Sequence, residues 1–168
     1  MARALITDPF HAFRFHVSVT SVNGRAALGP VAAGFTNVTL PTQSIENVEY
    51  KEGIWVYRRK FPGDPTFDDV TFIRGVTTTD SEFWIWANQT SRGLEYRADL
   101  EIKHFHRSDV GDQVDFSQLN PSRIIKIYEA FPISVKPGSD MDSVSSEISL
   151  QEITLSLERF EVTNNKAS

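Results

Sequence analysis

Residues 97–103 read Arg-Ala-Asp-Leu-Glu-Ile-Lys, and this stretch decides the fold more plainly than any other. Small or apolar residues alternate one by one with charged residues, which is the period-two pattern of a half-buried β-strand. We therefore expect a strand with one face in a core. The other face carries both signs of charge and has to see water; it consists of Arg97, Asp99, Glu101 and Lys103.

The same alternation recurs along the chain and predicts a protein built mainly of strands. The segments that carry it are residues 13–19, 34–40, 54–61, 70–75, 123–131 and 147–162. Residues 123–131 are apolar on both faces, so this strand should be central in its sheet. In residues 147–162 the apolar phase slips near Gln151 and Glu152, which indicates a β-bulge.

The connections between these strands are predicted from prolines and polar runs. Residues 61–65 read Phe-Pro-Gly-Asp-Pro and should form a turn, because neither Pro62 nor Pro65 can donate a backbone hydrogen bond to a neighbouring strand. Residues 108–121 are rich in Asp, Ser and Gly, and residues 132–146 are polar. We expect both segments to be loops.

One helix is predicted, and a capping box marks its start. The Thr79 hydroxyl can accept a hydrogen bond from the backbone N–H of Glu82, whose carboxylate reaches back. The helix should stop around Thr90, before Gly93. It is short, so packing has to hold it. The apolar stripe available for that packing consists of Phe83, Trp84 and Ala87, with Trp86 near its edge.

About seven strands and one helix, without an internal repeat, predict the fold class. Such a chain packs as an antiparallel β-sandwich or small barrel with the short helix on its flank or end. At 168 residues it is expected to form a single domain. Some of the expected strands are long, and long strands leave edges exposed unless something pairs with them. A protein that polymerises through sheet edges would use that feature.

The composition excludes several classes of protein. The chain has no cysteine, which rules out disulfides, thiolate nucleophiles and cysteine-based metal sites. A net charge of −5 argues against a general nucleic-acid binder, although a mildly negative wall would let DNA or acidic cargo slide past. No apolar run approaches the roughly 20 residues of a membrane helix, and the first residues do not resemble a signal peptide. We expect no membrane anchor and folding in the cytoplasm.

Candidate catalytic and metal-binding groups are few, and each is better explained by structure. His104 and His106 would share one face of a strand, with His11 or His16 to complete a site, but no carboxylate has ligand-like spacing. No P-loop, dinucleotide or nucleophile-elbow motif is present. We expect no cofactor, no metal and no enzymatic activity. The remaining candidates are interpreted as turn and core residues: Asp68 with Asp69, Asp140 with Asp142, and Trp84 with Trp86.

The most specific signal is the order of short motifs along the chain. They are Gly34-Phe35, Val48 to Gly53 (VEYKEG), Arg59 to Gly63 (RKFPG), Val70 to Val76 (VTFIRGV), Phe83 to Trp86 (FWIW), Ala130 to Pro132 (AFP) and the Ser-rich stretch 143–157. This order resembles the tail tube family of contractile phages, shared with the inner tube proteins of extracellular contractile injection systems. The resemblance spans about residues 10–162, the expected core of one tail-tube domain over 1–168 with short flexible termini.

The resemblance implies an assembly. Family members form hexameric rings in which strands of neighbours join into a continuous β-barrel around a lumen. Rings stack into a tube inside a sheath, seated on a baseplate and spike hub and closed by a tube terminator. The tube carries DNA or a protein effector. The particle, a virion or phage-tail-like machine, is assembled in the cytoplasm, and its tube is ejected through the target envelope on contraction.

Residue roles also follow from the resemblance. Residues 50–61, with the turn at Pro62 and Gly63, resemble the extended hairpin that reaches the adjoining ring. The charged face of residues 97–103 is expected to line the lumen or to face the sheath, with a position in the wall favoured. The inter-ring or inter-subunit contacts expected from the hairpin are Tyr50, Trp55, Tyr57, Arg59, Phe61, Pro62 and Gly63.

Two other functions remain open from the sequence. The first is a type VI secretion tube protein, which is also a hexamer but is itself secreted; the motif order resembles the phage-type branch more closely. The second belongs to another class: a small β-barrel that binds a small ligand as a monomer. It predicts a hydrophobic interior cavity and no ring, so the size of the particle in solution separates the two classes.

Overall fold

The computed structural model describes residues 14–21, 34–77, 81–94, 96–105, 120–141, 143–144 and 146–165. Within these residues it contains nine strands and one helix, against about seven strands expected. The elements are β1 (Phe15–Ser21), β2 (Asn37–Thr39), β3 (Gln43–Tyr50), β4 (Arg59–Phe67), β5 (Val70–Gly75), α1 (Glu82–Ser91), β6 (Ala98–His104), β7 (Arg123–Lys136), β8 (Leu150–Ser156) and β9 (Arg159–Asn164).

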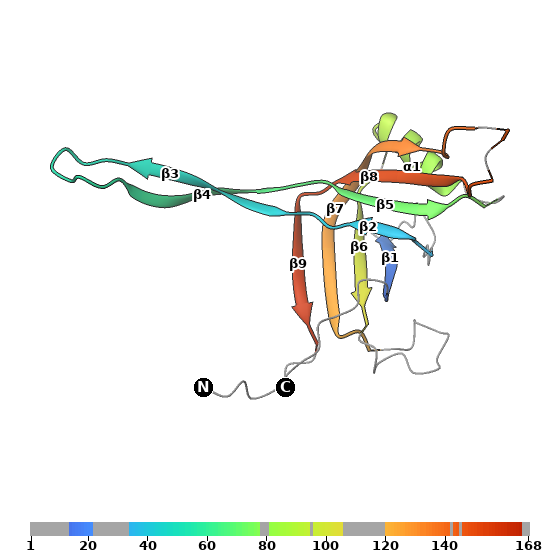
Figure 1. The fold of residues 1–168 in the computed structure, drawn as a ribbon, viewed down its shortest axis with the longest axis horizontal. Coiled ribbons are helices and arrows are strands. Elements are labelled where there is room, and N and C mark those ends of the chain that lie inside the picture. The colour runs from blue at the N-terminus through green and yellow to red at the C-terminus, as the bar shows by residue number, and fades with distance from the viewer. Residues whose placement is uncertain are drawn as a thin grey trace.

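Two antiparallel sheets share the long strand β7. Its first half pairs with β6 and β9, and β6 pairs with β1; these four strands are called the first sheet. The second half of β7 pairs with β8, which pairs with β5, which pairs with β2; these four form the second sheet. The strands of the two sheets run across one another in Figure 1. The body is therefore a β-sandwich with crossed sheets, which confirms the predicted fold class.

The bend in β7 is made by a bulge that the sequence did not reveal. Ala98 pairs with Ala130, but Leu100 pairs with Ile127, so β7 contains an extra residue at this point. Glu129 has a φ of 54°, in the left-handed region that a non-glycine residue rarely adopts. Its backbone N–H donates to Asp99 Oδ1 at 3.0 Å. A bulge bends its strand, and here it turns β7 from one sheet into the other.

The core lies between the two sheets. Burial alternates along β5, β6 and β8, as the period-two pattern predicted. The strand at 123–131 is central as expected, since β7 pairs with β6, β8 and β9. The largest fully buried side chains of the sandwich are Phe72, Ile127, Ile153, Leu155, Val17 and Val70.

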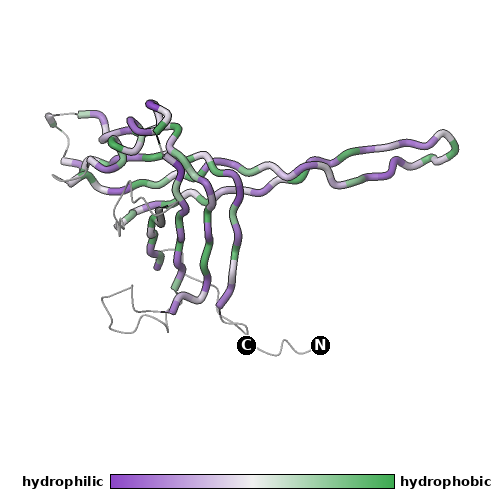
Figure 2. Tube along the Cα trace, turned by 180° about the vertical axis from the view of Figure 1, so that it is seen from behind, coloured by the Kyte–Doolittle hydropathy of each residue, from purple (hydrophilic) through white to green (hydrophobic). Residues whose placement is uncertain are grey.

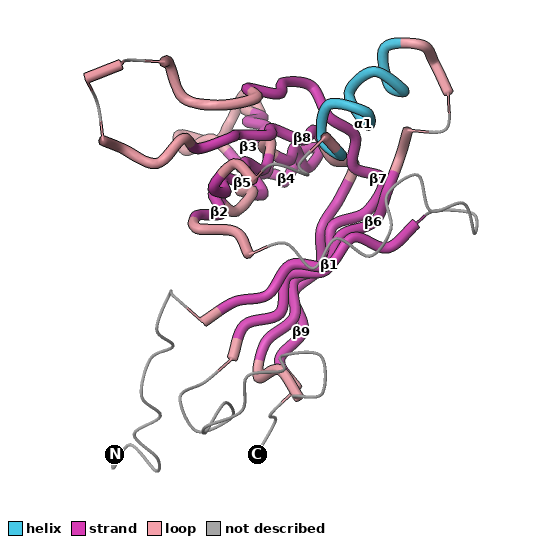
Figure 3. Tube along the Cα trace, turned by 90° about the vertical axis from the view of Figure 1, so that its right-hand side faces the viewer, coloured by secondary structure: helices cyan, strands magenta, loops and turns pink. Residues whose placement is uncertain are grey.

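The helix starts later than expected and buries a different side. Its N-cap is Ser81, which makes no side-chain capping bond, and Thr79 lies outside the described residues. Trp86 is buried and donates from Nε1 to the carbonyl oxygen of Tyr96, whereas Trp84 is 56% exposed. The predicted apolar stripe is thus confirmed for Phe83, which is buried, and was wrong for Trp84. Figure 3 shows α1 beside β7, against which it packs.

The end of the helix agrees with the sequence. Gly93 has a φ of 67° and follows the C-cap. Its N–H donates to the carbonyl of Thr90, and that of Leu94 donates to Gln89. This pair of bonds is a Schellman motif, which needs a left-handed residue and therefore favours glycine.

The strand predicted at 54–61 is confirmed for residues 59–61, which belong to β4, and was wrong for residues 54–58. Residues 51–58 form the tip of a two-stranded ribbon, and the strands are β3 and β4 on either side of it. Pro62 and Pro65, expected to stop pairing, lie within β4 opposite Asn47 and Ile45. Each strand of an isolated ribbon has one free edge, so a proline whose missing N–H faces that edge removes no hydrogen bond. The ribbon projects far from the body (Figure 1).

Two further expectations were wrong near the C-terminus. The supposed loop at 132–146 begins as strand, because β7 continues through Pro132 to Lys136. Residues 147–162 contain two strands instead of one bulged strand, and β8 pairs with β5 without a register shift. The phase slip arises because Ile148 is exposed before β8 begins, while Gln151 is buried.

The different burial of the two tryptophans gives a test of the fold. Trp86→Ala should lower the free energy of unfolding by about 3–5 kcal/mol, since it empties a buried site. Trp84→Ala should lower it by less than about 1 kcal/mol. Urea denaturation of both variants measures the difference, and similar values for the two would contradict the packing of α1.

Candidate functional site

The ribbon of β3 and β4 exposes large apolar side chains at its tip. Ile54 is 97% exposed, Val56 83% and Tyr57 80%. Figure 2 shows the hydrophobic colour at the far end of the ribbon, away from any core. Soluble proteins rarely expose such a cluster unless it binds something. The tip is therefore a candidate interaction surface.

The distal half of the ribbon has one apolar and one polar face. Val48 pairs with Phe61, and directly paired residues share a face of an antiparallel ribbon. Glu49 pairs with Lys60 on the opposite face. The Glu49 carboxylate lies 3.0 Å from the guanidinium of Arg58 and 3.9 Å from the Lys60 ammonium. These exposed ion pairs add little stability, but they mark which face stays in water.

Local contacts hold the shape of the ribbon. The backbone N–H of Trp55 donates to the carbonyl of Glu52 at 3.1 Å, and the Arg59 guanidinium lies 5.3 Å from the centre of the Trp55 ring. Gly63 lies in a bulge of β4, where a Cβ atom would come within 3.1 Å of Glu46. The close approach of the two strands thus favours glycine there, because any side chain would force Glu46 to shift by a few tenths of an ångström.

The structure brings the seven predicted contact residues together on this ribbon. Five of the seven side chains are large and lie on its distal half or at its tip. Their positions are the end of β3 for Tyr50, the tip for Trp55 and Tyr57, and β4 for Arg59, Phe61, Pro62 and Gly63. Sequence reasoning missed Ile54 and Val56 as contact candidates because it interpreted residues 54–61 as a paired strand.

The charged face predicted on residues 97–103 exists, and it is tied into the first sheet. The Lys103 ammonium lies 3.4 Å from Glu101. Arg97 forms ion pairs with Glu129, at 3.5 Å, and with Glu158. The bond to Glu158 raises the pKa of the Arg97 guanidinium above its ordinary value. Asp99 instead accepts the bond from the β7 bulge, so one of the four residues has a clear structural role.

Neighbouring strands extend this face with residues that sequence reasoning missed. Register places Lys126 beside Glu101 on one side and Glu161 on the other. The Tyr128 hydroxyl donates to Glu161 at 3.0 Å, and this bond raises the pKa of the phenol. The face therefore mixes both signs of charge: the acidic residues are Asp99, Glu101 and Glu161, and the basic ones are Arg97, Lys103, Lys126 and Arg159. The alternation of polar and apolar residues at 159–164 could have indicated the part that β9 contributes. It was missed because these residues were assigned to a longer strand.

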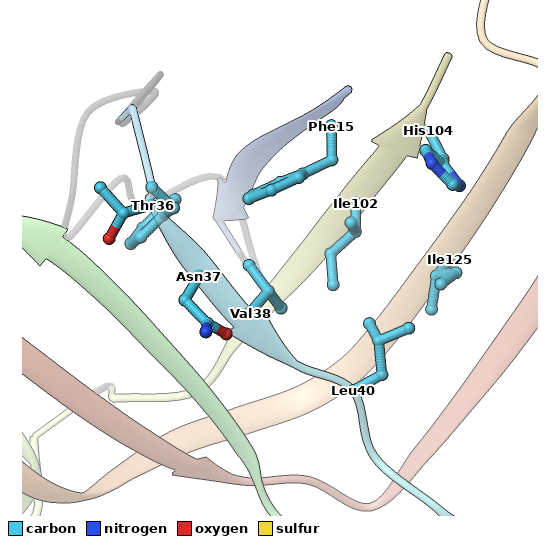
Figure 4. Close-up of a pocket in the computed structure, with 9 residues that line it drawn as sticks. Phe15, Thr36, Asn37, Val38, Leu40, Ile102, His104 and Ile125 are labelled. Atoms are coloured by element: carbon cyan, nitrogen blue, oxygen red, sulfur yellow. The ribbon is translucent and has the colours of Figure 1, made fainter. Parts of the chain in front are cut away.

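A groove opens between β2 and the first sheet. Its volume is about 480 Å³. Figure 4 shows the residues that line it on β1, β6 and β7 and on the segment 35–40, which contains β2. The lining is mainly apolar, with three polar residues: Phe15, Phe35, Val38, Leu40, Ile102 and Ile125, with Thr36, Asn37 and His104.

The described part of the chain offers no cluster of three or more His, Cys, Asp or Glu that could hold a metal ion. The proposed histidine set cannot be judged as a whole, because His11 and His106 lie outside the described residues. In the same described part, no helix has the length and apolar character needed to cross a membrane.

Comparison with known proteins identifies the family. A family model for the T4-like virus tail tube protein gp19 matches residues 11–161. The chain belongs to this tail tube family, a family of structural tube proteins, which confirms the resemblance stated above. No match was found among curated protein sequences.

Several solved structures share the fold. The anti-feeding prophage tube terminating cap is 20% identical, with a TM-score of 0.77 over 98% of this chain and 99% of that one. The sheath–tube complex of an extracellular contractile injection system, PVC, contains a chain 24% identical, with a TM-score of 0.73 over 93% and 92%. A type six secretion system protein is 11% identical, with a TM-score of 0.50 over 88% and 82%.

The bulge contact predicts an effect on stability. Asp99→Ala should lower the free energy of unfolding by about 1–2 kcal/mol, because the Glu129 N–H loses its charged acceptor. Asp99→Asn keeps a side-chain oxygen and should lose less. Chemical denaturation measures both, and an Asn variant as unstable as the Ala variant would show that the bond does not hold the bulge.

Proposed function

We propose that the protein is the inner tube subunit of a contractile phage tail or a related injection system, and that it acts as a hexameric ring. The observation that carries the proposal is the first sheet: among the described residues, its outer strands β1 and β9 each pair with one strand and leave their other edge unpaired. Unpaired edges invite pairing with another chain. Membership of the tail tube family supports the same assembly.

The direction of the strands favours a closed ring. The four strands of the first sheet alternate in direction, so β1 and β9 run antiparallel to each other. The β9 edge of one subunit can therefore pair with the β1 edge of the next and continue the antiparallel pattern. Such a head-to-tail contact forms a closed ring when the rotation from one subunit to the next is a whole fraction of a full turn. Six subunits with four strands each give a barrel of about 24 strands, roughly 35–50 Å across its backbone.

The faces of the first sheet then have different tasks. One face is buried against the second sheet, so the other, with Asp99, Glu101 and Lys103, lines a water-filled lumen. Because charges of both signs are mixed on this face, it neither binds nor strongly repels a passing polymer. The second sheet and α1 lie on the outer side, where a sheath protein would contact the tube. Rings stack through the ribbon, and the baseplate hub and tube terminator occupy the two ends of the stack. The cargo is DNA or a protein effector.

We assign the protein no catalysis and treat residues 1–168 as one tube domain. Assembly in the cytoplasm and ejection with the particle follow from the proposed role. The type VI alternative is weaker, since the type six protein has a TM-score of 0.50 against 0.73 for the PVC tube complex. A monomeric ligand-binding barrel is favoured by one observation, the groove of about 480 Å³, a size common among small-molecule sites.

Sizing of the purified protein followed by negative-stain electron microscopy tests the proposal, with baseplate added as a template. Six-fold rings with a central hole, or stacked tubes, are expected. A monomer that persists even with baseplate would contradict the tube assignment and favour the ligand-binding barrel.

The exposed tip gives a sharper prediction. Trp55→Ser combined with Tyr57→Ser should leave the thermal midpoint of the monomer nearly unchanged, because both side chains are largely exposed. The same variant should form at least tenfold fewer tubes in micrographs. Met141→Ser, at a fully exposed position away from the ribbon, is the control. Normal tubes from the tip variant would show that the tip of the ribbon makes no contact that the assembly needs.

A further inference from the structure

The second sheet covers the two outer strands of the first sheet unequally. On β1, Val17 and Val19 are 1% and 8% exposed and belong to the hydrophobic core. On β9, Val162 is 44% exposed, although it pairs with Ile125 and therefore lies on the same, core-facing side of the sheet. The second sheet is thus displaced toward β1 and leaves the apolar side of β9 uncovered in the single chain.

The uncovered side of β9 continues into the base of the ribbon. Phe160 lies two residues before Val162, so it is on the same side of the strand, and it is half-buried against Phe67. Leu40, which leads from β2 into the ribbon, is 48% exposed. It lines the groove together with Ile125, the partner of Val162. We call Leu40, Phe160 and Val162 the base patch.

A second apolar surface lies at the other end of the second sheet. Val76 follows β5, Ile148 precedes β8 and Leu150 begins β8; they are 40%, 78% and 40% exposed. They lie close together, because Gly75 pairs with Leu150 and a Cβ atom at Gly75 would be 3.9 Å from Ile148. We call these three residues the end patch. It lies on the side of β1, whereas the ribbon leaves past β9 on the opposite side (Figure 1).

Backbone hydrogen bonds hold the end patch in place. The N–H of Ser139 donates to Ser149 Oγ at 3.1 Å, and the N–H of Leu150 donates to Ser139 Oγ at 3.0 Å. The N–H of Val76 donates to the carbonyl oxygen of Ser149 at 3.0 Å. A surface whose backbone is already fixed loses less conformational freedom when it binds. The end patch is therefore preorganised for a contact.

We propose that, within one ring, the end patch of each subunit packs on the base patch of the neighbour whose β9 pairs with its β1. The inference rests on the tube function proposed above and adds an outer contact to the seam between strands. Pairing of the strands brings the uncovered β9 of one subunit beside the β1 of the next, toward which the second sheet of that next subunit is displaced. The contact joins opposite sides of identical subunits, so it closes together with the ring.

Because the chain has no cysteine, paired cysteine substitutions test the overlap directly. Ile148→Cys with Leu40→Cys should form disulfides between neighbours in assembled rings under mild oxidation. Within one chain, Leu40 lies near Thr71, since its neighbour Thr39 pairs with that residue. Ile148 lies beside Gly75, four residues further along β5. Those four extended residues keep the two positions at least roughly 13 Å apart, whereas a disulfide needs Cα atoms within about 7 Å.

The pattern on a non-reducing gel, read beside electron micrographs of the same sample with baseplate, distinguishes the outcomes. The proposal predicts a covalent ladder that ends at six subunits. The control, Ile148→Cys with Lys126→Cys, should give no ladder, because Lys126 is exposed on the opposite face of the first sheet. A ladder beyond six would place the contact between rings and overturn the proposal. Rings without a ladder would overturn the overlap alone, and an absence of rings would contradict the tube function as well.

A charge exchange tests the same contact without cross-linking. Val162→Asp and Ile148→Lys, each alone, should change the thermal midpoint of the monomer little, since both side chains are exposed. Each should reduce the yield of rings roughly tenfold or more, because a charge would be buried without a partner. The two combined should restore rings, since the new charges then face each other.

Thr163→Asp is the matched control for the charge exchange. Thr163 is exposed on the same strand as Val162, but on its opposite face, so the variant should form rings. Loss of rings to the same extent in this control would contradict the proposal. A double variant that forms no more rings than either single variant would contradict it too.

Discussion

The bond from the Glu129 backbone to the Asp99 carboxylate, 3.0 Å long, holds the bend on which the rest of the structure depends. It supports a residue in the left-handed region, a conformation that costs a non-glycine side chain free energy. With the bend, one strand serves two sheets and the sandwich closes around a single core. Without it, β7 would run straight on, and β8 could not cross the strands of the first sheet.

The packing of the sandwich leaves the apolar tip of the ribbon uncovered in the single chain. The body buries its apolar faces between its own sheets, whereas, in the part of the chain that the structure describes, β3 and β4 pair only with each other. A two-stranded hairpin has no second layer to cover it and is marginally stable alone in water. Its base is anchored through Phe67 on Phe160, and its apolar tip lies far from that anchor. In the proposed tube, the apolar tip would be covered by a partner outside the chain.

Sequence patterns predicted those parts of the fold where a strand has one buried face. Residues 97–103 gave the strand, its faces and its charged residues, because alternation there is uninterrupted. The pattern gave wrong predictions where apolar residues are not buried in the core of the single chain. Residues 54–57 are apolar without being buried, so their pattern wrongly predicted a strand. Pro62 and Pro65 lie in a strand, but prolines are typical of turns and were interpreted as one. On the helix, Trp84 and Trp86 are chemically alike, and only tertiary contact with Tyr96 separates the buried ring from the exposed one. The groove joins residues from four strands and left no local signal.

The free edges at β1 and β9 have a mechanical consequence for the proposed ring. A seam between two subunits would consist of the same backbone hydrogen bonds that join strands within each subunit. Such a wall contains no line of weaker bonding around its circumference, so a radial or twisting load is shared by all strands alike. Joints between rings would instead consist of side-chain contacts at the ribbons. A tube built this way resists splitting along its length, and it separates under tension between rings, not within them.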